Sequence, residues 1–250
     1  TAATLVVAAA GGRVAKHGNR SVSSKSGSAD LLEAAGVNLS ITPEQVAQCV
    51  NELGVGFMFA PAHHGAMKHA IGPRKELAMR TIFNILGPMT NPAGVKRMLI
   101  GVYDKALCRP VAEVLGRLGA KHVWVVHSED GLDEISIAAP TRVVELRAGE
   151  LDEFTLTPRE FGLEGRTLDG LDVEDAAASL ELIRAALTGD DDERARKAAE
   201  IIALNAGAAI HVAGLAESMA DGVAKAREAI ANGAAWQRLE QLASLTQGFK

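Results

Sequence analysis

The residues best suited to chemistry fall into three short segments of this chain. The first is residues 16–30, KHGNRSVSSKSGSAD, which holds three cations, five serines and two glycines, with no acidic residue before Asp30. Cationic, hydroxyl and backbone donors at this density suit the acceptor oxygens and the negative charge of a phosphate group. A solvated turn can have the same composition, so this segment alone leaves both interpretations open.

The other two segments carry opposite charges. Residues 61–80, PAHHGAMKHAIGPRKELAMR, hold three histidines and four cations against the single acid Glu76, whereas residues 128–136, SEDGLDEIS, hold four acids. Two basic segments and one acidic segment around a shared cleft suit a polyphosphate with Mg²⁺, because Mg²⁺ commonly takes one or two carboxylates plus phosphate oxygens.

Several of these residues also have a purely structural interpretation. The pair Asp133 and Glu134 is by itself typical of a turn or a helix start. His63 and His64 have neither partner cysteines nor the HExxH spacing of a zinc site. His211 lies in a run of alanines and isoleucines, which predicts a histidine packed in the core.

Composition and charge narrow the class of protein. At 250 residues, the chain can bury a full core as one large α/β domain or two smaller ones. Its net charge of −5 argues against nucleic-acid binding. The longest apolar run, residues 5–10, is too short to span a bilayer, and no charged segment of a signal peptide precedes it. Cys49 and Cys108 are predicted to be buried free thiols, which fits a reducing cytoplasm.

Hydrophobic patterning predicts strands that would bring the three segments together. The expected strands are RVAKH (13–17), VGFMFA (55–60), RMLIGVY (97–103) and KHVWVVH (121–127). A helix from 106 to 118, closed by Gly119, joins the last two and implies a parallel βαβ unit. Ligands bind beyond the carboxyl ends of strands in open parallel sheets, so the loops after the first, second and fourth strands should share one crevice.

The remaining chain predicts a hairpin followed by helices. TRVVEL and LDEFTL flank the turn RAGE, which indicates a β-hairpin over residues 141–156. Helices follow to the end of the chain, one of them running from about 193 to 212. Residues 1–12 have the pattern of a helix body ended by Gly11 and Gly12 but have no helix start, so we expect the natural N-terminus to lie upstream.

Three motifs resemble those of one enzyme family. VAKHGNRSVSSKSGSADLLEAAG, RTIFNILGPMTNPA and HSEDGLDEIS are similar to the anthranilate phosphoribosyltransferases, in the family's order and spacing, and ALNAGAAIHVAG resembles its C-terminal helix. The resemblance covers essentially the whole chain. It implies a nucleoside-phosphorylase-like phosphoribosyltransferase fold, with a mainly parallel sheet wrapped by helices. Residues 1–250 would form this α/β domain, with about 62–86 contributing helices to a small helical domain.

The resemblance also implies a reaction and its ligands. The family transfers the 5-phosphoribosyl group from phosphoribosyl pyrophosphate to the amine of anthranilate, releasing pyrophosphate, in tryptophan biosynthesis. By this resemblance phosphoribosyl pyrophosphate contacts Thr1, Lys16, His17, Gly18, Asn19, Arg20, Ser21, Val22, Ser23, Ser24 and Ser28. Anthranilate contacts His17, Asn19, His64, Arg74, Gly87 and Pro88, and the cofactor Mg²⁺ contacts Asp133 and Glu134. The implied reaction needs no protein nucleophile, and no general base stands out.

One departure from the family pattern affects activity and assembly. The family places a GTGGDG loop and an Asn-x-Ser-Thr turn just before the helix that opens this chain, and Thr1 matches the last residue of that turn. The glycine loop, a metal-contacting serine and the N-terminal helices of the small domain would then lie upstream. Those helices form much of the family's dimer contact. We therefore expect a homodimer only in a longer chain, and little activity from these 250 residues alone.

Three alternative functions stay open at this point. A pyrimidine nucleoside phosphorylase shares the fold type and a related loop bearing lysine and serine. A non-catalytic relative could bind nucleic acid in the same cleft, although such a protein should be basic overall. The chain could also be a folded remnant without activity. Neither a nucleic acid nor a membrane is an expected partner of the enzyme.

Overall fold

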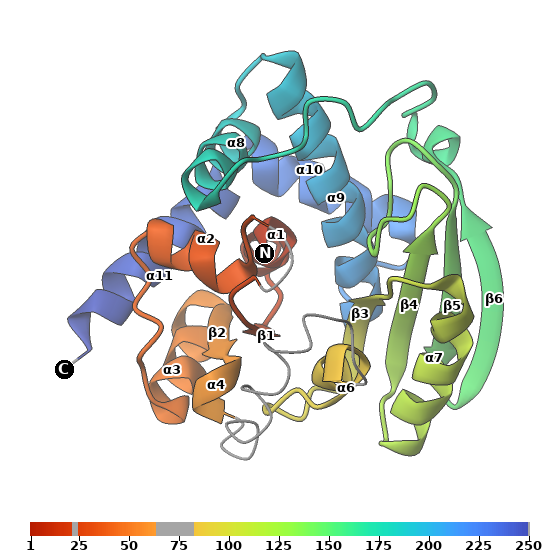
Figure 1. Cartoon of the computed structure of the whole chain (residues 1–250), viewed down its shortest axis with the longest axis horizontal. Coiled ribbons are helices and arrows are strands. Elements are labelled where there is room, and N and C mark those ends of the chain that lie inside the picture. Colours follow the sequence, from red (N-terminus) through yellow and green to blue (C-terminus); the bar gives the residue numbers. More distant parts are fainter. Residues whose placement is uncertain (22–24, 64–82, 250) are drawn as a thin grey trace.

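The computed structural model describes residues 1–21, 25–63 and 83–249, and it places two β-sheets among helices (Figure 1). The strands are β1 (Val14–Gly18), β2 (Val55–Phe59), β3 (Arg97–Gly101), β4 (His122–Ser128), β5 (Thr141–Arg147) and β6 (Glu150–Leu156). The helices are α1 (Ala2–Ala9), α2 (Ser28–Ala34), α3 (Pro43–Leu53), α4 (Ala60–His63), α6 (Phe83–Met89), α7 (Cys108–Arg117), α8 (Ala176–Thr188), α9 (Glu193–Ala213), α10 (Met219–Ala231) and α11 (Ala234–Gly248), with the 3-10 turns η2 (Lys105–Leu107) and η3 (Pro158–Phe161).

Each sheet contains one parallel pair of strands. β1 and β2 form a two-stranded parallel sheet, and β3 and β4 pair in parallel within the order β3-β4-β5-β6. The helix α7 connects β3 to β4, which confirms the predicted βαβ unit. β5 and β6 form the predicted hairpin. Its two turn residues, Ala148 and Gly149, have φ angles of 52° and 91°, as a two-residue hairpin turn requires.

The α/β class is confirmed, but the strands divide into two sheets where the sequence predicted one mainly parallel sheet. β1 and β3 do not pair. A cavity of about 1700 Å³ lies between them, lined by residues 13–18 on one side and 95–101 on the other. The side chain of Asn91 donates a hydrogen bond to the Ala15 carbonyl of β1 (3.0 Å). Periodicity identifies strands but does not say which strands are neighbours, so this division could not be predicted.

Helices cover both faces of the four-stranded sheet. Along β4, Trp124 and Val126 pack in the cluster that includes residues of α9 and α10, whereas Val123 and Val125 pack with residues of α7. This alternation follows the two-residue period of a strand that is buried on both faces. The second face of the sheet is therefore covered by α7, and Ile85 and Met89 of α6 pack against the same cluster.

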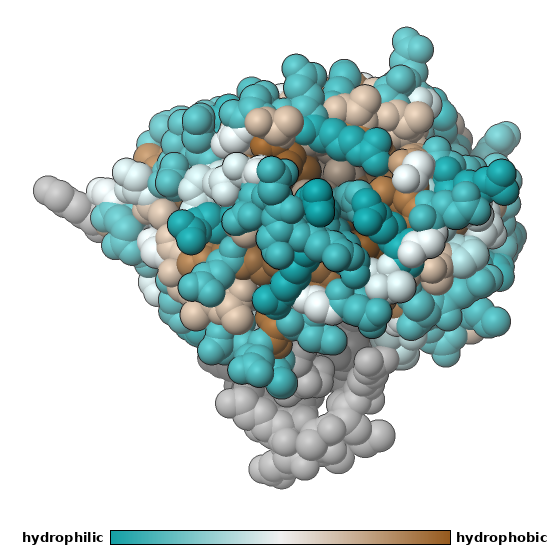
Figure 2. All heavy atoms as spheres, turned by 90° about the horizontal axis from the view of Figure 1, so that it is seen from above, coloured by the Kyte–Doolittle hydropathy of each residue, from teal (hydrophilic) through white to brown (hydrophobic). Residues whose placement is uncertain are grey.

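The largest core surrounds α1, which lies in the middle of the molecule with α9, α10 and α11 around it (Figure 1). Leu5 and Val6 of α1 are fully buried in it. Cys49 and Cys108 are buried and free, as predicted. Seen from above, most of the surface is hydrophilic, and hydrophobic residues show mainly in its recesses (Figure 2). Among the described helices, none is both long and apolar enough to cross a membrane.

Candidate active site

The cavity between β1 and β3 brings together most of the predicted site residues. The predicted residues that line it are Thr1, Lys16, His17, Gly18, Asn19, Arg20, Ser21, Gly87, Pro88, Asp133 and Glu134. Ser28 lies next to this set, because its hydroxyl accepts a hydrogen bond from Thr1 Oγ1 (2.9 Å). The predicted residues Val22, Ser23, Ser24, His64 and Arg74 lie outside the described residues. The loops after β1 and β4 line this cavity together with Ala60, Pro61 and His63, which follow β2. The rest of the segment after β2, residues 64–82, lies outside the described residues.

Lys16 reaches the cavity from β1. It is half-buried, and this burial lowers the pKa of its amine below the ordinary value, while the negative charge of Glu134 acts in the opposite direction. The basic segment and the acidic segment therefore interact electrostatically across the cavity. Burial disfavours the charged form of the Lys16 amine. An anion bound next to it would favour that charged form again.

Asp30 closes the loop that follows β1. One of its carboxylate oxygens, Oδ2, accepts hydrogen bonds from the backbone N–H groups of Ser21 and Gly27, both at 2.9 Å. A Cβ atom on Gly27 would lie 2.5 Å from the Ser21 nitrogen, so only glycine fits there. These contacts lower the pKa of Asp30, with the Ser21 hydrogen bond the largest cause. The two ends of the serine-rich segment are thus held together.

Arg20 lines the cavity, but its guanidinium is held by an acid of α2. It forms a two-pronged ion pair with Glu33, at 2.6 and 2.8 Å, and lies over the ring of Phe59 with its central carbon 5.7 Å from the ring centroid. A phosphate ligand would have to compete with Glu33 for this arginine. The arrangement gives Arg20 a clear role in holding the loop on α2.

A buried asparagine holds the acidic loop in place. Asn205 of α9 accepts a hydrogen bond from the Ile135 N–H through Oδ1 and donates to the Ile135 carbonyl through Nδ2, both at 2.9 Å. The same Nδ2 donates to the carbonyl of Ile201 in its own helix (2.9 Å). Asp133 and Glu134 come immediately before Ile135 and are exposed to the cavity. Their position relative to α9 therefore depends on this side chain.

The acidic loop also lies directly on β3. A Cβ atom on Gly101 would be 1.5 Å from the Asp133 carbonyl oxygen, a distance no side chain can occupy. Glycine at this position lets the backbone of Asp133 approach the strand. Gly101 and Asn205 thus both act on the backbone that carries the two carboxylates.

Asp130 belongs to the same acidic segment but has a structural role. Burial tends to raise the pKa of its carboxyl, but hydrogen bonds from the Ser136 hydroxyl and the Leu132 N–H outweigh that effect and lower it. Its oxygens are therefore committed to the loop itself. Asp133 and Glu134 remain as the pair that can face a ligand.

Two carboxylates fit Mg²⁺ that is shared with a phosphate ligand. No third aspartate, glutamate, histidine or cysteine of the described residues lies close enough to Asp133 and Glu134 to complete a cage of protein ligands. Mg²⁺ usually keeps waters and phosphate oxygens beside one or two carboxylates, so an incomplete set of this kind suits it.

Three residues that the sequence reading did not single out shape this site: Asn91, Gly101 and Asn205. A lone amide among the small apolar residues of ALNAGAAIHVAG was a usable signal for Asn205, because a buried amide must find partners. Asn91 and Gly101 had no such signal, since their partners are backbone groups far away in sequence.

Comparisons with known proteins show which family this chain resembles. Residues 1–236 match the model of the glycosyl transferase family, a/b domain. The chain is 64% identical to an anthranilate phosphoribosyltransferase of Azotobacter vinelandii, over 100% of this chain and 72% of that protein. It is 66% identical to the one from Saccharophagus degradans, over 97% of this chain and 71% of that protein.

Solved structures give the same picture of the fold. The anthranilate phosphoribosyltransferase from Thermus thermophilus superposes with a TM-score of 0.90 at 44% identity, covering 99% of this chain and 72% of that one. The chain thus has the α/β domain of a glycosyltransferase. It belongs to the anthranilate phosphoribosyltransferase family, as the three sequence motifs indicated. This membership favours the phosphoribosyltransferase over the pyrimidine nucleoside phosphorylase.

Proposed function

We propose that this chain transfers the 5-phosphoribosyl group from phosphoribosyl pyrophosphate to the amine of anthranilate, releasing pyrophosphate. The observation that carries the proposal is the shared cavity, in which Lys16 and the end of β1 lie opposite Asp133 and Glu134. A donor with many negative charges needs both a cationic wall and a place for Mg²⁺, and the cavity offers the two together.

The phosphoribosyl donor would lie against the end of β1 and the loop that Asp30 closes. Lys16 offers an amine, Asn19 an amide and Ser21 a hydroxyl, and all three line the cavity. Mg²⁺, when held by Asp133 and Glu134, supplies positive charge that stabilises the departing pyrophosphate. A structure of the anthranilate phosphoribosyltransferase from Saccharomyces cerevisiae, which shares the fold at 24% identity and a TM-score of 0.84, contains PRPP and Mg.

The anthranilate acceptor would lie between the first loop and α6. Gly87 and Pro88 line the cavity there, as do His17 and Asn19 on the other side. The aromatic amine attacks the anomeric carbon, the bond from that carbon to pyrophosphate breaks, and the amine loses a proton to solvent. The protein's contribution is to position a weak nucleophile and to stabilise the leaving group. Arg74 suits the acceptor carboxylate, because its planar fork matches two oxygens.

The same proposal covers organisation and setting. Residues 1–250 would form the α/β domain, with about 62–86 contributing to a small helical domain, and a longer chain would form a homodimer. The enzyme would work in the cytoplasm, with neither nucleic acid nor membrane as a partner. The net charge of −5 and two buried free cysteines support this setting.

Loss of anthranilate fluorescence in the presence of phosphoribosyl pyrophosphate and Mg²⁺ tests the proposed activity. Any turnover, even at a low rate, should need all three components and yield one pyrophosphate for each anthranilate consumed. Phosphorolysis of thymidine or uridine in place of this reaction would overturn the proposal. A folded chain that binds neither substrate, with a native circular dichroism spectrum, would support the inactive remnant instead.

A further inference from the structure

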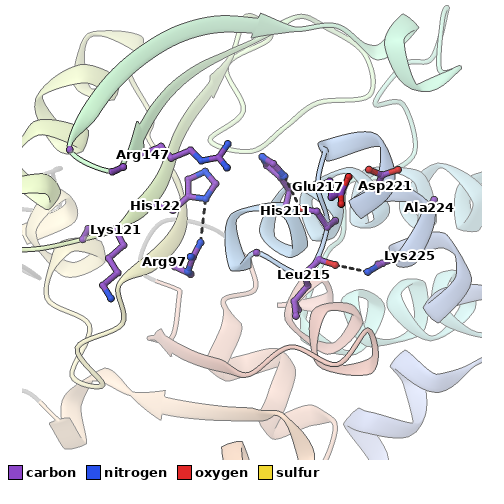
Figure 3. Close-up of a pocket in the computed structure, with 15 residues that line it drawn as sticks. Arg97, Lys121, His122, Arg147, His211, Leu215, Glu217, Asp221, Ala224 and Lys225 are labelled. Carbon is purple, nitrogen blue, oxygen red and sulfur yellow. Dashed lines mark hydrogen bonds between the residues drawn. The ribbon is translucent and has the colours of Figure 1, made fainter.

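A second cavity, of about 1160 Å³, lies at the end of the four-stranded sheet where β3 and β4 begin (Figure 3). It is lined by Arg97 and His122, the first residues of β3 and β4, and by Arg147, the last residue of β5. The end of α9 and the start of α10 form its opposite side. Arg97, Lys121 and Leu215 line both cavities, but the acidic loop of the candidate active site follows the far end of β4.

Three potential metal ligands lie together here, and two of them, His122 and His211, line the cavity. His122 of β4, Glu145 of β5 and His211 of α9 each offer one ligand atom, and these atoms all lie within 4.8 Å of one another. In the described part of the chain they form the one group of three such side chains this close. Donors bound to Zn²⁺ at about 2.0–2.1 Å in a tetrahedron lie about 3.3 Å apart, so small side-chain rotations would close this group on an ion.

Neighbouring groups orient two of these ligands. His211 Nδ1 lies 3.2 Å from the Ala216 carbonyl oxygen. A carbonyl only accepts, so Nδ1 carries the proton and Nε2 keeps its lone pair. Trp124 Nε1 donates to Glu145 Oε1 at 2.8 Å and fixes the carboxylate. Histidines that bind metals usually donate their other N–H to a carbonyl or carboxylate in this way.

The third ligand, His122, directly contacts the carboxylate of Glu145. Its side chain is 5% exposed and that of Glu145 is 16% exposed. His122 Nε2 lies 2.6 Å from Glu145 Oε1. A carboxylate only accepts, so Nε2 carries the proton, and this proton must move to Nδ1 of the same ring for a metal to bind Nε2.

Two cations act against a metal here and offer a sharp test. Arg97 donates a hydrogen bond to the Val212 carbonyl at 2.8 Å and lies 3.4 Å from His122 Nδ1. Its shorter hydrogen bond is therefore to Val212 and not to His122. The charge of Arg147 also reaches His122. Each should weaken the binding of a positive ion without supplying a ligand.

We propose that His122, Glu145 and His211 bind a divalent first-row transition metal, with Zn²⁺ as the fitting ion. Two imidazoles and one carboxylate, with a fourth position open to a cavity, are a common Zn²⁺ ligand set. The ligands come from β4, β5 and α9, so the ion ties the sheet to the helix. The proposal does not depend on the proposed reaction.

Calorimetric titration of the EDTA-treated chain with Zn²⁺, in excess Mg²⁺ to occupy hard-cation sites, tests it. We expect one Zn²⁺ per chain and a higher melting temperature. His211→Ala, at a half-buried position, should weaken binding by more than the roughly 10- to 100-fold typical of an outer-shell change. Glu145→Gln should do the same, and it provides a second reading if His211→Ala does not fold.

The controls separate this cluster from other ligands. Glu217→Gln removes an acid of the same cavity outside the cluster, and His63→Asn removes a histidine elsewhere; both should leave Zn²⁺ affinity unchanged. Arg97→Gln should tighten binding, because it removes a nearby positive charge. Unchanged affinity in His211→Ala, or loss of Zn²⁺ binding in His63→Asn, would overturn the proposal.

Discussion

Asn205 and Ile135 form a closed pair of hydrogen bonds between α9 and the loop after β4. The Asn205 side chain satisfies both backbone groups of Ile135, at 2.9 Å each, and is itself buried. Such a pair imitates one step of a β-ladder, with a side chain in place of a strand. It places the neighbouring carboxylates of Asp133 and Glu134 relative to the cavity.

Asn205→Ala should therefore affect Mg²⁺ use as well as stability. It leaves the N–H and C=O of Ile135 without their partner, at a cost of about 1–3 kcal/mol for each buried group. We expect lower stability in urea and a higher Mg²⁺ concentration for half-maximal activity. Asn38→Ala is the control. The Asn38 side chain also forms hydrogen bonds with backbone groups, those of Ser40 and Thr246, but these are not part of the candidate active site. An equal shift in Mg²⁺ dependence for both variants would contradict the positioning role.

Asp133→Asn combined with Glu134→Gln should abolish most activity without unfolding the chain. Both residues are exposed, and amides keep the size of the side chains while removing the charge. Excess Mg²⁺ should restore activity only in part, because the ligands themselves are weakened. Glu164→Gln, at another exposed acid, is the control. Mg²⁺ titrations of the steady-state rate measure the effect, and an unchanged titration curve in the double variant would contradict the assignment.

Lys16→Gln should weaken the binding of the phosphoribosyl donor far more than the binding of anthranilate. One lost charge-assisted hydrogen bond of about 1.5–3 kcal/mol corresponds to roughly 10- to 100-fold in donor affinity. Separate Michaelis constants for the two substrates measure the difference. Lys105→Gln, an exposed lysine outside the cavity, should change neither. An equal rise in both Michaelis constants would show that Lys16 is not part of the donor site.

The two cysteines should be unreactive in the folded chain. Burial raises the pKa of Cys49 to about 11 and raises that of Cys108 as well. At pH 8 the Cys49 thiolate is then roughly one molecule in a thousand, and thiolate is the reactive form. The buried neutral thiol of Cys49 contributes fully to the free energy of unfolding below pH 9. This contribution declines as the pH rises toward 11, because the Cys49 thiol of the unfolded chain ionises at a lower pH than that of the folded chain. Ellman's reagent should react only after denaturation, and fast reaction of the native chain at pH 8 would show that the thiols are accessible.

Local rules predicted much of the fold from the sequence. Thr42 and Gln45 form reciprocal capping bonds, with Pro43 in the first turn of α3, a pattern that the sequence TPEQ alone indicates. The two left-handed residues between β5 and β6 explain why the RAGE turn was recognisable. Each of these features depends on residues within a few positions of one another, so the sequence contains the whole cause.

Long-range contacts explain what the sequence could not predict. The sequence predicted a packed His211, and its ring does pack against His122 and Trp124, with centroids 5.5 and 5.4 Å away. The sequence did not predict that the same side chain lines a cavity. Its position depends on the loop after α9, where the chain turns at Gly214. The contact between Gly101 and Asp133 likewise joins residues that no local pattern relates. Motif resemblance found the carboxylates but not the groups that hold them.

Gly101→Ala gives the strictest test of the candidate site. The new methyl would lie 1.5 Å from the Asp133 carbonyl oxygen, which is backbone and cannot rotate away, so the acidic loop must move. We expect a large loss of activity and a weaker response to Mg²⁺, with a loss of stability of at least about 1–3 kcal/mol, as for other overpacked sites. Gly116→Ala is the matched control: it lies inside α7, its nearest neighbour is a flexible Leu146 methyl at 3.3 Å, and alanine favours a helix by about 0.5–1 kcal/mol. Activity, Mg²⁺ titration and urea unfolding should be measured for both. Normal Mg²⁺-dependent turnover in Gly101→Ala would mean that the carboxylates do not need the position that β3 gives them.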